Sequence, residues 1–166
     1  VMRLVSAKER SLGELPVLVH TIERAKEIGN IDRASLRLAQ RFWPGPLTLV
    51  VPARVVLPTQ VTGPSNTVGL RIPNRRETLE LVKQCGGAII GTSANTTGHS
   101  PPRTAEEVRR DLEGRIDIVL DGGPATLSAE STVVRMDNGE VTILREKAVS
   151  KKEISDALAA GPVPEK

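Results

Sequence analysis

Residues 92–102 are dense in hydroxyl-bearing and small side chains. They read T-S-A-N-T-T-G-H-S-P-P and follow an apolar stretch, residues 88–91, that is typical of a buried strand. Open α/β sheets place their ligands where strands end, and a loop of small residues lets backbone N–H groups come close to a phosphate. The same residue types also favour turns for purely local reasons. The composition of this segment therefore fits either a phosphate-binding loop or an ordinary turn.

Four basic residues are further candidates for holding an anion. Lys8 and Arg10 lie in one loop, Arg71 stands in an otherwise apolar strand sequence, and Arg145 ends a later one. An arginine among apolar neighbours is costly to bury unless its guanidinium meets an anion. The alternative for Arg71 and Arg145 is a structural ion pair or a head group in water at a strand edge. For Lys8 and Arg10 the alternative is a solvated loop.

Side chains for dedicated acid–base or covalent catalysis are scarce. The chain contains no Walker-type loop, no dinucleotide-binding glycine pattern and no His-Glu zinc helix. His20 and His99 are the two histidines, and no serine stands in a nucleophile-elbow sequence. We expect both histidines to make local hydrogen bonds, and Cys85 to be an inert small residue near a helix end. Ser131, in the run A-E-S-T, could bind a ligand or form a turn.

Apolar periodicity and capping signals divide the chain into interleaved strands and helices. The expected strands are residues 16–20, 47–51, 67–72, 88–91, 116–120, 132–136 and 141–145. The expected helices are residues 1–7 (the end of a helix), 21–28, 31–42, 75–85, 105–113 and 151–160. Capping-box spacing opens the last three of these helices, at Asn74/Glu77, Thr104/Glu107 and Ser150/Glu153. Asn138-Gly139 predicts a terminal hairpin, so the expected class is α/β with a mixed parallel and antiparallel sheet.

Length and composition set further bounds. The 166 residues suffice for one domain, and the net charge of +3 is compatible with an anionic ligand. Phe42 and Trp43 are the only aromatic residues, which excludes an aromatic stacking platform for single-stranded nucleic acid. A single cysteine forms no intramolecular disulfide, and with two histidines it makes no usual zinc site. No apolar run is long enough for a membrane span, and we expect a cytoplasmic protein.

Several short blocks, in this order along the chain, together resemble a known family. They are K-E-R at residues 8–10, P-V-L-V at 16–19, W-P-G-P-L-T-L-V at 43–50, V-G-L-R-I-P at 68–73, T-S-A-N with Gly98 at 92–98, E-S-T-V at 130–133 and I-L-R at 143–145. The chain is thereby similar to the YrdC-type L-threonylcarbamoyladenylate synthases, and the resemblance covers nearly its whole length. It implies a YrdC-like twisted sheet with flanking helices and a concave basic face.

The resemblance also implies a reaction. Members of this family join L-threonine, bicarbonate and ATP into threonylcarbamoyl-AMP and pyrophosphate, for threonylcarbamoyladenosine modification of tRNA. The nucleophile comes from the substrate, which agrees with the shortage of catalytic side chains. Mg²⁺ would accompany ATP, with no protein metal site expected. Further implied partners are tRNA or double-stranded RNA and downstream tRNA-modification proteins. The rival interpretations are a non-catalytic double-stranded RNA-binding module of the same fold and a paralogue acting on another small acceptor.

Individual positions can be matched to this family. Lys8 and Arg10 match a Lys-x-Arg pair that contacts the ATP phosphates and the carbamate, and they are the expected catalytic residues. The expected ATP contacts are these two with Thr67, Ser93, Asn95, Pro101 and Arg145. The expected threonine contacts are Arg71, facing the carboxylate, with Gly91 and Ser131.

Three departures from the family pattern qualify the match. The strand and Pro-Thr-(Glu/Asp)-Thr-Val-Tyr-Gly-Leu signature that precede Lys8 in the family are absent, and the chain begins at Val1. Leu15 stands where many members have His, and Ser11 replaces a common Pro. We expect residues 1–160 to form a YrdC-like domain without its N-terminal part, and residues 161–166 to be a tail or the start of a linker. If these residues are the whole molecule, we expect it to be inactive or severely impaired.

Overall fold

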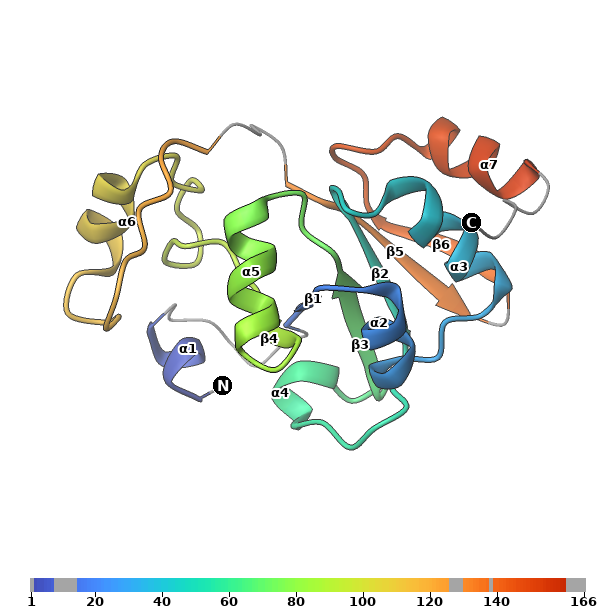
Figure 1. Ribbon diagram of the computed structural model, residues 1–166, viewed down its shortest axis with the longest axis horizontal. Coiled ribbons are helices and arrows are strands. Elements are labelled where there is room, and N and C mark those ends of the chain that lie inside the picture. The colour runs from blue at the N-terminus through green and yellow to red at the C-terminus, as the bar shows by residue number, and fades with distance from the viewer. Residues whose placement is uncertain (1, 8–14, 126–129, 138, 161–166) are drawn as a thin grey trace.

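The computed structural model describes residues 2–7, 15–125, 130–137 and 139–160 (Figure 1). Its strands are β1 (Val17–Val19), β2 (Leu47–Pro52), β3 (Thr67–Arg71), β4 (Ala88–Ile90), β5 (Thr132–Asp137) and β6 (Glu140–Arg145). Its helices are α1 (Met2–Ala7), α2 (Ile22–Ile28), α3 (Arg33–Phe42), α4 (Thr59–Thr62), α5 (Arg76–Gln84), α6 (Ala105–Leu112) and α7 (Lys151–Ala159). Every helix expected from the sequence is present, and α4 is an additional single turn.

The six strands form one mixed sheet in the order β4-β1-β3-β2-β5-β6. The pairs β1–β3 and β2–β5 are parallel, whereas β1–β4, β2–β3 and β5–β6 are antiparallel. This arrangement confirms the mixed α/β sheet. The expected hairpin is also present as β5–β6, and Gly139 takes a positive φ of 85° in its turn, as the Asn-Gly signal predicts.

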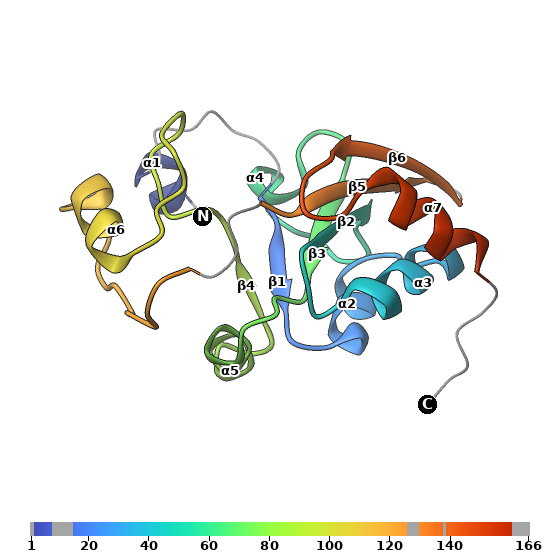
Figure 2. The ribbon, with the colours of Figure 1, turned by 90° about the horizontal axis from the view of Figure 1, so that it is seen from above.

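The two faces of the sheet differ because side chains alternate along each strand. Leu47, Leu49 and Val51 of β2 point into the aliphatic core, together with Val68 and Leu70 of β3. Helices α2, α3 and α7 cover this face and contribute Ala25, Ile28, Leu38, Ala39 and Ile154 to the core (Figure 2). The intervening residues of the same strands are thereby directed to the opposite face.

Capping explains where several helices begin. Thr104 and Ser150 form complete capping boxes with Glu107 and Glu153, as expected. The expected box at Asn74 is wrong: α5 is capped at Arg75, whose side chain makes no cap hydrogen bond. The carboxylate of Glu77 instead accepts a hydrogen bond from Arg75 Nε at 3.3 Å. The Glu77 side chain, which a capping box would need, is instead used in an ion pair with Arg75.

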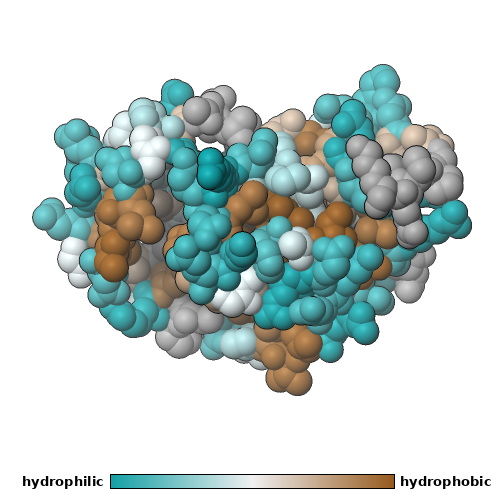
Figure 3. All heavy atoms as spheres, viewed as in Figure 1, coloured by the Kyte–Doolittle hydropathy of each residue, from teal (hydrophilic) through white to brown (hydrophobic). Residues whose placement is uncertain are grey.

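The expected strand at residues 116–120 is also wrong. The segment has the apolar composition of a strand. However, it lies beside α6 and α1, beyond β4 at the end of the sheet (Figures 1 and 2). Within the described part of the chain, no strand lies next to it to complete backbone hydrogen bonds. As a result Ile118 and Leu120 are 75% and 73% exposed, and Figure 3 shows apolar surface at this end of the molecule.

Among the described residues, none of the helices combines the length and the apolar composition needed to cross a bilayer.

Candidate functional site

A cleft of about 490 Å³ lies on the face of the sheet that the helices leave uncovered. Its floor comes from four neighbouring strands, through Leu18 of β1, Gly69 of β3, Val50 of β2 and Val133 of β5. Five residues singled out from the sequence line it together: Arg71, Gly91, Ser93, Ser131 and Arg145. They come from segments that are far apart in the chain, so the sheet order is what brings them together.

Arg71 ends β3 and places its guanidinium in the cleft. Its Nε donates a hydrogen bond to the carbonyl of Gly45 at 2.9 Å. Burial lowers the pKa of Arg71, and the nearby positive charge of Arg145 lowers it further. Two guanidinium groups close enough to repel each other are stabilised by an anion between them. This geometry favours anion binding for Arg71 over the alternative of a structural ion pair, because no described carboxylate pairs with it.

Arg145 ends β6 and is fastened to the segment before β5. Its Nε and Nη2 donate to the carbonyl of Ser131 at 3.2 and 3.0 Å, and Nη2 also reaches Ser131 Oγ at 3.3 Å. Its Nη1 lies 3.4 Å from the carboxylate of Glu130. Arg145 therefore makes a structural contact and also lines the cleft; its contact with a ligand stays a prediction.

Two residues of the cleft were not anticipated from the sequence. Thr48 of β2 is only 5% exposed, and its hydroxyl donates to Ser131 Oγ at 3.0 Å. Glu130 supplies a carboxylate to the cleft. The alternation of β2 could have indicated Thr48, since a polar residue at its position must face away from the Leu47 and Leu49 core.

Gly91 continues from β4 and donates its N–H to the carbonyl of Pro16 at 2.8 Å. A Cβ at this position would lie 2.6 Å from Leu18 Cγ, so only glycine allows this approach. Gly91 therefore offers backbone alone, as expected. Thr92 and Ser93 follow it, and they line both this cleft and a second, more apolar cavity of about 570 Å³ next to α1 and α6.

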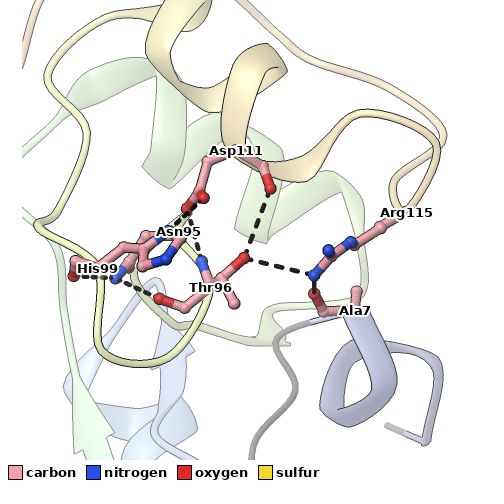
Figure 4. A network of polar contacts seen from close by, with 6 residues as sticks. All are labelled: Ala7, Asn95, Thr96, His99, Asp111 and Arg115. Carbon is pink, nitrogen blue, oxygen red and sulfur yellow. Dashed lines mark hydrogen bonds and ion pairs between the residues drawn. The ribbon is translucent and has the colours of Figure 1, made fainter.

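Three further candidates, all among the described residues, do not line the cleft. Asn95 is buried and holds its own loop, donating to the carbonyls of Thr96 and His99 at 3.0 and 2.7 Å (Figure 4). Thr67 begins β3, on the same face as Gly69 and Arg71 but further along the strand. Pro101 is exposed beyond the loop. Lys8 and Arg10 lie outside the described residues.

Other residues noted in the sequence have local roles. The ring of His20 shares a hydrogen bond with the carbonyl of Gly87 at 3.2 Å, and His99 Nδ1 lies 2.6 Å from Asp111 Oδ1. Leu15 is buried in the protein. Cys85 is exposed at the end of α5.

The described residues of the cleft are suited to binding rather than to acid–base chemistry. No group of three His, Cys, Asp or Glu side chains among the described residues is placed to hold a metal ion. Among the described residues, Glu130 is the carboxylate that lines the cleft, and it is already paired with Arg145. What the cleft offers is positive charge, hydroxyl groups and backbone from several strands, which can hold anionic reactants side by side.

Comparison with known proteins places the chain in a family context. Residues 1–147 match the family model Sua5_yciO_yrdC, which is described as "Telomere recombination". A threonylcarbamoyl-AMP synthase of Pyrococcus abyssi is 34% identical over 161 residues, which are 95% of this chain and 47% of that protein. One from Bacillus subtilis is 34% identical over 167 residues, with 98% of this chain and 47% of that protein covered.

A solved structure shows the same fold. The crystal structure of P. abyssi Sua5 complexed with L-threonine superposes with a TM-score of 0.89 at 32% identity, over 98% of this chain and 48% of that one. The chain thus spans about half the length of the curated relatives it matches.

Proposed function

Since the chain belongs to the Sua5_yciO_yrdC family, we propose that it forms threonylcarbamoyl-AMP and pyrophosphate from L-threonine, bicarbonate and ATP. The observation that carries the proposal is the cleft itself. It gathers Arg71, Ser131 and Arg145 on one face of the sheet, beside the loop that begins at Ser93.

Threonine is assigned to the Arg71 side of the cleft. The threonine carboxylate would accept hydrogen bonds from the Arg71 guanidinium. Among the described residues, no carboxylate already pairs with this guanidinium. Ser131, held by Thr48, is placed to meet a polar group of the amino acid, and Gly91 supplies backbone. A related protein of the same fold has been crystallised with L-threonine, which supports this amino acid as the substrate.

The nucleotide is assigned to the Ser93 and Arg145 side. The positive charge of Arg145 would attract the phosphates, and Ser93 would contact the nucleotide from the loop that follows β4. Thr67, Asn95, Pro101, Lys8 and Arg10 complete the proposed ATP set, the last two as the residues that also contact the carbamate. Mg²⁺ enters as part of the ATP substrate, bound to its phosphate oxygens.

The reaction needs no nucleophile from the protein. The threonine amine takes up the carbon of bicarbonate, with loss of water, to give a carbamate. A carbamate oxygen then attacks the α-phosphorus, and the bond to the bridging oxygen breaks to release pyrophosphate. The residues of the cleft would hold the reactants in line and offset the phosphate charge.

The wider setting is proposed on the same basis. The product would pass to the proteins that attach the threonylcarbamoyl group to tRNA. The proposed location is the cytoplasm, a reducing compartment in which the free cysteine Cys85 would stay reduced.

Pyrophosphate release, measured with each substrate omitted in turn, tests the proposal. We expect release that requires both L-threonine and bicarbonate, and heat of ATP binding that increases when threonine is present. Binding of double-stranded RNA without a response to either small ligand would favour a binding module instead. Release that occurs with another amine in place of threonine would indicate a paralogue with a different acceptor.

A further inference from the structure

Asp111, near the end of α6, holds the loop that carries Ser93. Its two carboxylate oxygens have different partners in that loop (Figure 4). Oδ2 accepts a hydrogen bond from the backbone N–H of Thr96 at 2.7 Å, and Oδ1 lies 2.6 Å from His99 Nδ1. These contacts, above all the one from Thr96, hold the pKa of Asp111 below its ordinary value. The carboxylate is therefore ionised whenever the loop is in this conformation at neutral pH.

The position of Asp111 is unfavourable for the helix itself. A negative charge in the last turn of a helix opposes the helix dipole, and the neighbouring Arg109 and Arg110 are the residues that such a turn favours. The helix thus gains nothing from a carboxylate here, whereas the loop gains two hydrogen bonds.

Other hydrogen bonds lie within the loop itself. Asn95 Nδ2 donates to two of its carbonyls, and the N–H of His99 donates to the carbonyl of Thr96 at 3.1 Å. Gly98 has a φ of 92°, which allows the tight return. These bonds shape the loop but do not attach it to the rest of the molecule. Asp111 attaches it to α6.

Thr96 is also connected to α1, through the side chain of Arg115. Arg115 Nη1 lies 3.5 Å from Thr96 Oγ1 and 3.4 Å from the carbonyl of Ala7, the last residue of α1 (Figure 4). Ala7 directly precedes Lys8 in the sequence. Arg115 therefore bridges the loop that follows Ser93 to the end of α1, the helix that precedes Lys8 in the sequence.

We propose that Asp111 is a positioning residue for ATP binding: by fixing Thr96 and His99 to α6, it sets the position of Ser93 at the cleft. The inference rests on the proposed function, which assigns Ser93 to the nucleotide. Asp111 does not line the cleft and touches no reactant. The proposed threonine contacts Arg71 and Ser131 have their described hydrogen bonds with Gly45, Thr48 and Arg145, outside this network.

The test compares Asp111→Asn and Asp111→Ala with Glu106→Gln in the full chain. Glu106 is an exposed carboxylate on the same helix, and among the described residues its ion pair is with Arg110, so its removal changes the charge of α6 without touching the loop. Titration calorimetry with ATP and, separately, with L-threonine gives the two affinities. Amide hydrogen exchange at Thr96 reports whether the loop remains attached.

Loss of hydrogen bonds to an ionised group predicts a Kd for ATP raised about tenfold in Asp111→Asn, and more in Asp111→Ala. The Kd for threonine and both affinities of Glu106→Gln should stay unchanged, while Thr96 exchanges faster in the Asp111 variants alone. Unchanged ATP affinity, or equal weakening of both ligands with a lower melting temperature, would overturn the positioning role and leave the proposed function standing. A wild-type chain that binds neither ligand would overturn both.

Discussion

At the scale of single residues, the two arginines of the cleft are held in different ways. Arg145 already has a carboxylate, Glu130, and the Ser131 carbonyl, whereas Arg71 has only the Gly45 carbonyl among the described residues. An incoming carboxylate therefore meets less competition at Arg71 than at Arg145. The two side chains should respond differently to truncation.

Replacing Arg71 by Ala should raise the threonine requirement more than the ATP requirement. Loss of a charge-assisted hydrogen bond to the carboxylate costs about 2 kcal/mol, or about thirtyfold in threonine affinity. Steady-state kinetics with each substrate varied in turn measures the two KM values. Arg110→Ala, which removes an exposed guanidinium from α6, serves as the control. Equal increases in both KM values would remove Arg71 from the threonine site.

Replacing Arg145 by Ala should weaken ATP binding and leave the domain folded. The guanidinium is part-exposed, so its contacts with Ser131 and Glu130 are worth only about 1 kcal/mol to stability. Titration calorimetry with ATP and thermal unfolding on the same preparation separate the two effects. A large fall in melting temperature with unchanged ATP affinity would make Arg145 a structural residue.

The sequence indicated the charged residues of the cleft but not the buried polar residue Thr48. Arg71 stood out because an arginine in an apolar strand needs a reason to be there. Thr48 did not, since a threonine is common in strands and its partner Ser131 is 83 residues away. Which polar side chains meet across a sheet depends on strand order, and no local pattern encodes that order.

At the scale of elements, Thr132 joins the start of β5 to the turn before α7. Its hydroxyl donates to the carbonyl of Val149 at 2.7 Å and accepts from the N–H groups of Lys147 and Val149, both at 2.9 Å. Thr132 and Val149 are both buried, so water cannot replace the two bonds between them, whereas Lys147 is exposed. Thr132 thereby fixes the strand end next to Ser131.

Thr132→Val keeps the shape of the side chain and removes all three bonds. The buried N–H and carbonyl groups left without a partner should lower the free energy of unfolding by about 3 kcal/mol. Urea denaturation measures it, and Thr132→Ser, which keeps the hydroxyl, should retain most of the stability. A loss as large in the serine variant would show that the methyl group, and not the hydrogen bonds, is what matters.

The capping box of α7 predicts a pH dependence. Hydrogen bonds from the side chain and the N–H of Ser150 hold the pKa of Glu153 below its ordinary value of 4.5. A carboxyl whose pKa is lower in the folded state stabilises the fold fully above its unfolded pKa, and that contribution is lost as the pH falls through the lowered value. Ser150→Ala should therefore have a lower melting temperature than the wild-type protein at neutral pH. This margin between the two melting temperatures should become smaller below pH 4.5.

Thermal unfolding of both proteins from about pH 7 to about pH 3 gives that margin directly. Thr104→Ala, which opens the matching box on α6, serves as the contrast: the carboxylate of Glu107 accepts from the backbone N–H groups of Arg103 and Thr104, which the substitution keeps, so the fall in melting temperature should change little with pH. A margin that stays constant with pH would mean that Glu153 contributes nothing through its charge.

Element boundaries were predictable where the signal was local and uncontested. The boxes at Thr104 and Ser150 have the spacing and no competing partner, whereas at Asn74 the neighbouring Arg75 draws in Glu77. The single turn of α4 is too short to have a period and follows Pro58, so nothing in the sequence separated it from a loop.

At the scale of the whole molecule, interleaved strands and helices were enough to predict a mixed sheet, and the strand order was not predictable. The placement of β2 between β3 and β5 is what brings Arg71 and Arg145 into one cleft. The strand expected at residues 116–120 failed for a related reason, because pairing depends on a neighbour as much as on the residues themselves.

That unpaired segment has a practical consequence for handling the protein. Ile118 and Leu120 are exposed apolar residues in an extended segment that no strand of the described chain pairs with, and such an edge favours association between copies of a protein. We call this segment the ribbon. Light scattering against concentration should show self-association that Ile118→Lys suppresses, since a lysine acts as a gatekeeper on such an edge. Val56→Lys, at a fully exposed valine in the loop between β2 and α4, should not suppress it. Equal solubility of all three proteins would mean that the ribbon is harmless in solution.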